Sequence, residues 1–407
     1  MAYMIEEKRQ IDVTADCDVL VVGGGIAGVS AAIAAARNGE KVILLEREFG
    51  LGGLATLGLI VLYLPLCDGE GTQVSYGLAE ELLRLSICHG AQQNEPTHWL
   101  NPAPLAERKK SRYMTQFNPN YFALELEKLL GSLHVQILYG TVAAAVHMQG
   151  KKIDAVIVES KSGRSAITAG AVIDATGDAD ICKYAAAPTA LYEKKNGLAS
   201  WYYYDSEAGG AKLKMFGLAD VVSDDPQSAT KNETVSVLEQ HRYTGVDSAE
   251  VSQMVLRAHE KMLDDILQCK QKDERYAPVS ISSIPLLRMT RRLKGCYDLD
   301  DTQSHEYFSD SIGMIGDWRK RGPVYEIPFA CLHCAEVDNL LAAGRNISVT
   351  DAMWDISRVI PACAITGEAA GTAASITKNF NDLDTAKLQD RLVRQGVILH
   401  WNDLQNK

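Results

Sequence analysis

The residue pattern with the most definite chemistry is a glycine-rich turn, GGGIAG at residues 23–28. Gly23 permits a tight strand-to-helix turn, Gly25 lets the backbone approach a pyrophosphate, and Gly28 lets the helix pack closely on the strand. Amides at the start of the following helix would donate to the phosphates. The turn therefore predicts a site for a dinucleotide.

Later segments indicate how long that ligand is. Glu46 ends the next strand about 20 residues on, where a carboxylate accepts hydrogen bonds from ribose hydroxyls. The loop GGLAT follows at 52–56, and two more strands end in glycine turns, DATGD at 174–178 and AAGR at 342–345. If the loops after several strands all contact one ligand, that ligand must be long, which favours an extended dinucleotide.

These segments also carry a resemblance to a known family. The chain resembles FAD-dependent oxidoreductases of the glutathione-reductase-like flavoprotein superfamily. The shared segments follow the family order along nearly the whole chain: GGGIAG, Glu46, GGLAT, DATGD, LRMTRR at 287–292, VYEIPFACL at 324–332, NLLAAGRNIS at 339–348 and SRVIPACAITGEAAGTAA at 357–374. The resemblance implies an α/β fold, with a Rossmann-like FAD-binding domain and an inserted α+β substrate domain.

The resemblance further implies which residues contact FAD. The glycine-rich turn would contact the pyrophosphate, and Glu46 and Arg47 would contact the adenosine end. The segment around Gly344 would contact the ribityl chain. The implied contacts are Gly23, Gly25, Ile26, Ala27, Gly28, Glu46, Arg47, Gly53, Ala55, Thr56, Val142, Ala175, Thr176, Gly177, Gly344, Arg345, Pro361 and Ala362. Many relatives have Gly-Asp where this chain has Gly344-Arg345, and a His where it has Asp351.

A helix predicted for 361–377 would begin at the flavin. Pro361 suits a first helical position, and free amides near Ala362 and Cys363 would face the flavin pyrimidine oxygen. The helix dipole would then stabilise negative charge on the reduced flavin and raise its potential.

Five residues are candidates for substrate chemistry: Arg292, Arg358, His333, Asp351 and Tyr63. Arg292 shares a face of an extended segment with Arg288 and could hold a carboxylate or a polyol, although interdomain salt bridges explain these arginines equally well. His333 and Tyr63 could transfer a proton, but a structural role is commoner for such isolated residues. Asp351 could orient a partner or act as a base.

Dithiol and metal chemistry are not expected. Disulfide reductases of this superfamily carry redox cysteines at the positions of Ala55 and Ile60. Cys331 and Cys334 form a CxxC pair that could be redox-active or bind a metal. Only His333 stands nearby in sequence, so a structural role is favoured and no metal site is predicted.

Charge, hydrophobicity and cysteine content indicate which kinds of binding partner to expect. The net charge of −11 argues against a nucleic-acid partner, and no apolar run approaches the roughly 18 residues that a membrane span needs. Nine scattered cysteines without a secretory signal indicate reduced thiols and a cytoplasmic location. The expected partner is a small-molecule substrate, and a homo-oligomer is left open.

Periodicity and turn signals predict the elements that must position these residues. The FAD-binding domain would be discontinuous, comprising 12–60, 120–190 and 335–380. Residues 61–119 would form an insertion of helices and loops, 190–334 the substrate domain, and 381–407 a C-terminal helix.

This organisation favours an enzyme that transfers a hydride between flavin N5 and a small metabolite, either a sugar-derived alcohol or an unsaturated acid. The alternative is a flavin-carrying subunit that relays electrons within a larger complex.

Overall fold

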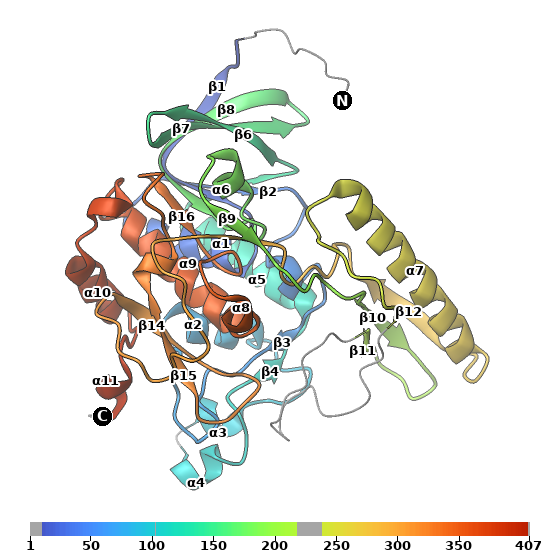
Figure 1. The fold of residues 1–407 in the computed structure, drawn as a ribbon. Coiled ribbons are helices and arrows are strands. Elements are labelled where there is room, and N and C mark those ends of the chain that lie inside the picture. The colour runs from blue at the N-terminus through green and yellow to red at the C-terminus, as the bar shows by residue number, and fades with distance from the viewer. Residues whose placement is uncertain (1–9, 102, 218–237, 406–407) are drawn as a thin grey trace.

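The computed structural model describes residues 10–101, 103–217 and 238–405. Its centre is a seven-stranded sheet in the order β5-β2-β1-β8-β7-β6, in which β16 also pairs with β8 (Figure 1). The strands are β1 (Val13–Val22), β2 (Val42–Glu46), β5 (Gln136–Tyr139), β6 (Val142–Gln149), β7 (Lys152–Ser160), β8 (Gly163–Asp174) and β16 (Leu340–Ala342). β5, β2, β1, β8 and β16 are parallel, whereas β6, β7 and β8 form an antiparallel meander.

Alternating side chains along β1 build a core on each face of the sheet. Val19 and Val21 pack with the helices on one face. Leu20 and Val22 pack on the other face with residues of the meander and of α6 (Asp180–Tyr184). β2 is buried along its whole length and apolar from Val42 to Leu45, which is typical of a parallel strand covered on both faces.

Two helices rich in small residues cover the first face, α1 (Ile26–Arg37) and α9 (Ile360–Ala374). They approach so closely that a Cβ at Gly367 would lie 2.2 Å from the carbonyl oxygen of Ala27, and a Cβ at Gly371 would lie 2.2 Å from that of Ala31. The glycines of α9 therefore set the spacing between the two helices.

The register aligns the carboxyl ends of the parallel strands. Val22 of β1 is paired with Leu45 of β2 and with Asp174 of β8. Asp174 is paired in turn with Ala342 of β16. The loops after these strands therefore emerge at one edge of the sheet, where ligands bind in open α/β folds.

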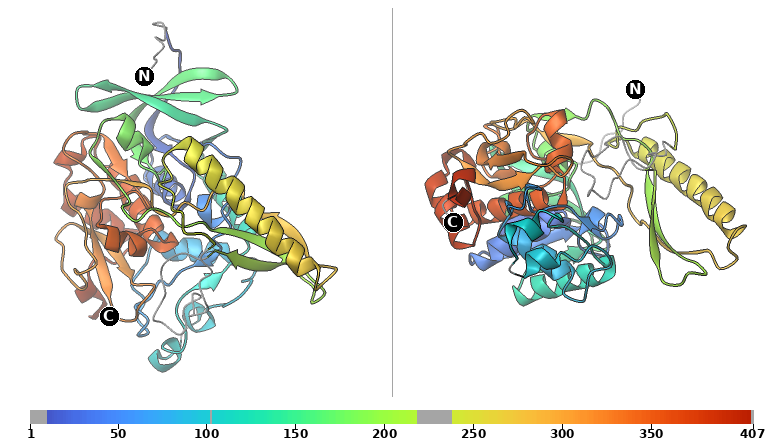
Figure 2. Two further views of the ribbon diagram at one scale, coloured as in Figure 1. Left: turned by 45° about the vertical axis from the view of Figure 1, so that its right-hand side comes forward. Right: turned by 90° about the horizontal axis from the view of Figure 1, so that it is seen from below.

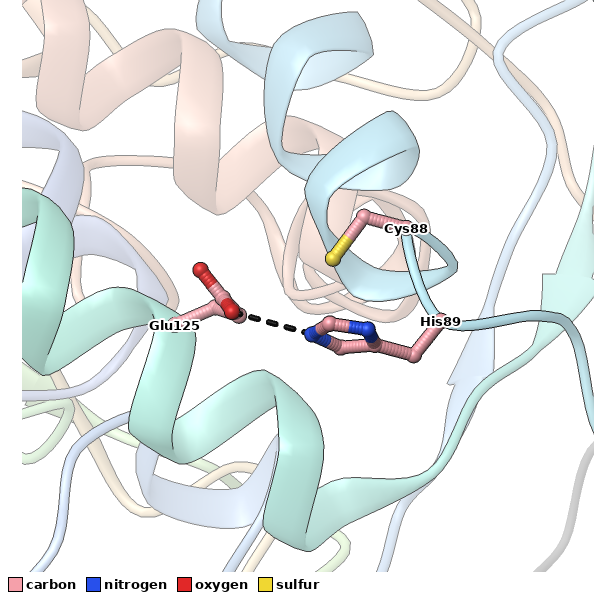
Figure 3. A group of neighbouring side chains, drawn as sticks. All are labelled: Cys88, His89 and Glu125. Atoms are coloured by element: carbon pink, nitrogen blue, oxygen red, sulfur yellow. Dashed lines mark hydrogen bonds and ion pairs between the residues drawn. The ribbon is translucent and has the colours of Figure 1, made fainter.

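Residues 61–119 form helices and loops together with one antiparallel pair of two-residue strands. They form β3 (Leu62–Tyr63), α2 (Leu78–Ser86), α3 (Thr97–Leu100), α4 (Leu105–Arg108) and β4 (Thr115–Gln116), after the single turn η1 (Gly53–Ala55). α2 packs against α5 (Pro119–Ser132), and at this junction Cys88 and His89 lie beside Glu125 (Figure 3). The side chain of Asn118 caps α5 by accepting hydrogen bonds from the amides of Asn120 and Tyr121.

Residues 190–334 contribute to two separate places (Figure 2). An arm projects from the body and combines a three-stranded sheet with the long helix α7. Its elements are β10 (Ser200–Asp205), β11 (Lys212–Phe216), β12 (Ala277–Ile281) and α7 (Ser248–Lys270). The hairpin β14 (Ser311–Gly316) and β15 (Val324–Pro328) instead packs beside α9 and α10. β9 (Thr189–Leu191) and β13 (Arg291–Leu293) form a two-stranded connection, and η2 (Phe329–Cys331) follows β15.

The end of the chain holds two helices rather than the single one predicted. They are α10 (Thr385–Arg394) and α11 (Trp401–Gln405), with α8 (Asp351–Ser357) and η3 (Phe380–Asp382) before them. Gly396, with φ of +93°, ends α10 in the left-handed conformation that favours glycine. Among the helices within the described ranges, none has the length and hydrophobicity of a membrane span.

Candidate functional site

A cavity of about 380 Å³ opens where the parallel strands end. Its walls come from the loops after β1, β2, β8 and β16, from the start of β6, and from the first turns of α9. A further wall comes from the loop 284–287, which precedes β13. The cavity thus joins segments that span most of the chain.

The turn 23–28 requires glycine at two positions for steric reasons, and a third glycine faces the cavity. Gly23 has φ of +105°, and a Cβ there would lie 2.4 Å from the carbonyl oxygen of Ala175. A Cβ at Gly28 would lie 1.8 Å from the carbonyl oxygen of Gly23. A Cβ at Gly25 would meet no atom within 4 Å, because this residue faces the open cavity.

A second glycine loop lies directly against the first. Gly52 forms a bridge with Gly25, and its amide donates to the carbonyl of Gly24 at 2.8 Å. Gly52 and Gly53 have φ of +98° and +54°, so their backbone takes conformations that side chains disfavour. The two loops form a cradle of exposed backbone on one side of the cavity.

Glu46 is held at the end of β2 by the backbone. Its side chain accepts hydrogen bonds from the amides of Gly24 at 2.7 Å and Glu48 at 2.8 Å. Burial raises the pKa of this carboxyl, and those two amides oppose the rise. A Cβ at Gly24 would lie 2.9 Å from Oε2 of Glu46, so the middle glycine of the turn makes room for the acid.

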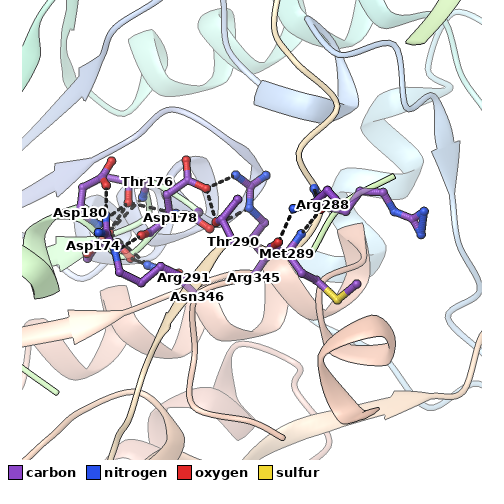
Figure 4. A network of polar contacts seen from close by, with 12 residues as sticks. Asp174, Thr176, Asp178, Asp180, Arg288, Met289, Thr290, Arg291, Arg345 and Asn346 are labelled. Carbon is purple, nitrogen blue, oxygen red and sulfur yellow. Dashed lines mark hydrogen bonds and ion pairs between the residues drawn. The ribbon is translucent and has the colours of Figure 1, made fainter. Parts of the chain in front are cut away.

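An ion-pair network joins the turn after β8 to the turn after β16 (Figure 4). Arg345 donates to the carbonyl of Gly177 and to Asp178, both at 2.7 Å. Arg291 pairs with Asp180 at 2.6 Å, and burial with the nearby charges of Asp178 and Asp174 raises the pKa of Asp180 to about 6. The arginine that replaces the usual acid after Gly344 therefore ties two cavity walls together.

A second part of the lining, called the apolar end below, is made mostly of apolar side chains. Leu54, Leu57, Ile284, Pro285, Leu287, Ile360 and Cys363 form it together with Arg358. Nε and Nη2 of Arg358 contact Oδ1 of Asp355 at 3.0 and 2.5 Å. Burial alone would raise the pKa of Asp355, but the guanidinium groups of Arg358 and Arg288 hold it below its ordinary value. The carboxylate is thus ionised and fixes the orientation of Arg358.

Most of the residues with implied cofactor contacts line this cavity. They are Gly23, Gly25, Ile26, Ala27, Glu46, Arg47, Gly53, Ala55, Val142, Ala175, Thr176, Gly177, Gly344 and Arg345. Gly28, Thr56, Pro361 and Ala362 lie behind the lining. Gly28 packs on Gly23, and the Thr56 hydroxyl donates to the carbonyl of Leu51.

Of the five candidates for substrate chemistry, Arg358 alone is in the cavity lining, and the structure places the others elsewhere. Arg292 lies 3.5 Å from Asp351 and 5.4 Å from the ring centre of Trp354, in an interior ion pair behind α8. Arg288 and Arg292 contact different carboxylates, Asp355 and Asp351, so they do not form the shared clamp that the extended segment predicts.

Tyr63 and His333 contact groups that lie outside the cavity lining. Tyr63 is fully buried and donates to the carbonyl of Ala79 at 2.6 Å, and burial raises the pKa of its phenol well above the ordinary value. His333 lies near Asn381 and Cys296, and burial lowers the pKa of its imidazole. Neither side chain faces the cavity, so neither is placed to exchange a proton with a ligand bound there.

The apolar wall is what sequence reasoning missed. Leu54 and Leu57 stand beside the glycines at 52 and 53, while Ile284, Pro285 and Leu287 come from a loop more than 200 residues later. Their apolar side chains resemble those of any core residue, and only the fold brings them to one surface. The one feature of the sequence that could have indicated this wall is the position of Leu287 at the start of the LRMTRR segment.

The cavity fits an extended dinucleotide on three structural grounds. The two glycine loops present bare backbone to the cavity, where a Cβ would reduce the space for a ligand. Glu46 is buried at the end of β2. The N-cap of α1 is Gly25, so this helix begins without a side-chain cap. An uncapped helix start leaves amide donors for phosphate oxygens. α9 also begins without a side-chain cap, at Val359, beside the apolar end.

Comparisons with known proteins agree with this geometry. The model of the family described as FAD dependent oxidoreductase matches residues 18–226 and 204–392. A stretch of 70 residues is 33% identical to thioredoxin reductase of Ureaplasma parvum, and the match covers 17% of this chain and 23% of that protein.

The solved structures that match this chain share little sequence with it. One is a geranylgeranyl bacteriochlorophyll reductase-like protein from Thermoplasma acidophilum, with 14% identity, a TM-score of 0.45, and coverage of 94% of this chain and 84% of that one. Another is a 3-ketosteroid dehydrogenase from Rhodococcus jostii, with 13% identity, a TM-score of 0.42, and coverage of 89% and 98%. The family match spans most of the sequence, so this chain belongs to the FAD-dependent oxidoreductase family and is an enzyme whose cofactor is FAD.

Proposed function

We propose that this enzyme transfers a hydride between N5 of the flavin and a small organic acid, and that Arg358 holds the carboxylate of that substrate. The observation that carries the proposal is the guanidinium of Arg358, which lies in the cavity lining together with apolar side chains. FAD supplies the hydride chemistry itself, and the protein binds, orients and shields the reactants.

The placement of FAD follows from the two ends of the cavity. The adenosine would lie beside Glu46 and Val142, with the ribose hydroxyls donating to the Glu46 carboxylate. The pyrophosphate would lie against the cradle at Gly25 and Gly53. The isoalloxazine would then lie between the 284–287 loop and the uncapped start of α9.

Arg358 is preorganised to bind an anion. Two of its nitrogens are held by Asp355, so the guanidinium keeps one orientation at little entropic cost on binding. Asp355 also lies 3.9 Å from Arg288 and 3.8 Å from Arg319, so this carboxylate is shared among three cations. A planar guanidinium of this kind matches the geometry of a carboxylate.

The surrounding wall favours an unsaturated acid over a sugar-derived alcohol. Leucine, isoleucine and proline side chains cannot satisfy the hydroxyl groups of a polyol, and each unsatisfied buried hydroxyl costs free energy. An acid with an apolar body needs only one polar contact, which Arg358 provides. Burial raises the pKa of the Cys363 thiol in this wall to about 12, so at neutral pH it is a neutral group and not a nucleophile.

The test compares carboxylates with polyols of matched size. Each compound is titrated anaerobically into the holoenzyme, and the flavin absorption spectrum reports both binding and reduction or reoxidation. We expect carboxylates to perturb the spectrum, and Arg358→Gln to weaken their binding by roughly tenfold or more, the scale of a hydrogen bond to a charged group. Arg358→Lys should restore part of this loss.

The control is Arg84→Gln, which removes an exposed guanidinium on α2 and should leave carboxylate binding unchanged. Polyol binding without carboxylate binding would contradict the proposal, as would equal carboxylate affinities in Arg358→Gln and wild type. Flavin reduction only in the presence of a protein partner would favour the electron-relay alternative instead.

A further inference from the structure

We propose that Cys88, His89 and Glu125 form a surface binding site for a divalent metal ion of the zinc class, and that the ion links α2 to α5 (Figure 3). The sulfur, a ring nitrogen and a carboxylate oxygen of these residues lie within 4.8 Å of one another. None of the three residues lines the FAD cavity, so the site is separate from the one described above.

The backbone brings the two adjacent ligands to the same side. α2 ends at Ser86, and the amide of Gly90 donates to the carbonyl of Ile87 at 2.8 Å, which closes a turn over Cys88 and His89. Gly90 takes φ of +99°, a conformation suited to glycine, and continues this turn. Both side chains consequently project toward α5 (Figure 3).

The facing helix fixes the other half of the site. Nε2 of His89 lies 3.0 Å from Oε1 of Glu125. The imidazole also packs on Tyr121, one helical turn before Glu125, with ring centres 4.7 Å apart. Two contacts from one helix therefore hold the imidazole in place beside the carboxylate.

The ligand types select the class of metal. Thiolate, imidazole and carboxylate together are ligands of Zn²⁺, whereas Mg²⁺ and Ca²⁺ prefer oxygen alone. Tetrahedral Zn²⁺ places its ligand atoms roughly 3.5 Å apart, so the present spacing needs only a small side-chain rotation of exposed Cys88. Three protein ligands leave the fourth position to water.

One neighbouring cation competes for the same carboxylate. Nζ of Lys128 lies 3.2 Å from Oε2 of Glu125 and 3.4 Å from Oε1, the oxygen that also contacts His89. A metal bound at this carboxylate would therefore be repelled by the charge of the lysine. Lys128→Gln is accordingly expected to tighten metal binding.

The test uses Co²⁺ and Zn²⁺ on the purified, reduced holoenzyme. Co²⁺ is expected to bind at one ion per chain and to give ligand-field absorption at wavelengths beyond the flavin bands, with an intensity typical of tetrahedral coordination. Zn²⁺ should displace it. Metal affinity should fall by roughly tenfold or more in each of three variants, Cys88→Ser, His89→Ala and Glu125→Gln. Removing a residue that only supports a metal ligand already lowers metal affinity by about that factor.

Cys296→Ser is the matched control, because Cys296 is also exposed and also lies beside a histidine, His333, at 3.7 Å. It should leave Co²⁺ binding unchanged. Iodoacetamide labelling adds a second readout on unmutated protein, where Zn²⁺ should slow alkylation of Cys88 and not of Cys296. Absence of tetrahedral Co²⁺ absorption in wild type, or equal affinity in Cys88→Ser, would overturn the proposal, and neither result depends on the FAD site.

Discussion

Glu46 is the residue whose surroundings most clearly match a role in holding FAD. Its carboxylate is buried, yet its two backbone hydrogen bonds leave lone pairs on both oxygens. Hydrogen bonds to a charged acceptor are stronger than those to a neutral one. The charge on this side chain should therefore contribute directly to cofactor affinity.

Glu46→Gln is predicted to weaken FAD binding by roughly tenfold, because a neutral acceptor replaces a charged one. Flavin fluorescence during titration of the apoprotein measures the dissociation constant. Glu159→Gln, on β7, removes an equal charge from a side chain that is 46% exposed and outside the cavity lining, and should have no effect. An unchanged FAD affinity in Glu46→Gln would remove this acid from the cofactor site.

At the scale of elements, the contact between α1 and α9 positions both helix starts that face the cavity. Gly367 and Gly371 allow this contact, since any side chain would strike the backbone of α1. The same two helices provide the phosphate end and the proposed flavin end. Their packing therefore links stability to cofactor geometry.

Gly371→Ala is predicted to destabilise the protein by about 1–3 kcal/mol, because its methyl group would lie 2.2 Å from the Ala31 carbonyl oxygen. Chemical denaturation measures the free energy of unfolding. Gly131→Ala is the matched control, since this glycine of α5 has open space at its Cβ and the change should be neutral or slightly stabilising. Equal effects of the two substitutions would contradict the tight contact.

A buried acid on α9 predicts an unusual pH dependence of stability. Glu368 accepts from the amide of Leu78, and burial raises its pKa from 4.5 to about 8. Between those values the native protein holds a proton that the unfolded chain has released, so its contribution makes the free energy of unfolding fall as pH rises. Glu368→Gln should flatten this decline between about pH 5 and pH 8, as measured by denaturation at several pH values. A slope identical to that of wild type would show that Glu368 ionises normally.

At the scale of the whole molecule, local patterns predict the dinucleotide half of the site and little of the substrate half. The residues of this half belong to short motifs, GGGIAG, Glu46 and DATGD, whose function depends on the local turn that holds them. Their spacing in the sequence is therefore enough to predict the site. α1 begins at Ile26, inside the GGGIAG turn, and β8 ends at Asp174, where the DATGD segment begins. These elements follow from local periodicity and glycine placement.

The substrate half depends on contacts between distant segments. For Tyr63 and His333 a structural role was the commoner expectation and proton transfer the alternative, and only the contacts with α2 and with η3 show where these side chains lie. Arg358 was recognised because it immediately precedes α9, whereas the wall at 284–287 had no local signal. Arg292 faces Asp351 because α8 passes beside β13, a contact that no sequence spacing reveals.

The most direct test of the account is to fill the cradle at Gly25. This residue has φ of −68°, which any residue adopts, and open space at its Cβ, so Gly25→Leu should leave the fold of the apoprotein intact. The side chain would occupy the space assigned to the pyrophosphate. The measurement is the molar ratio of FAD to protein after reconstitution, beside the circular dichroism spectrum and Tm of the apoprotein. We predict one FAD per chain in wild type and almost none in a folded Gly25→Leu variant, whereas full FAD retention by that variant would contradict the assignment.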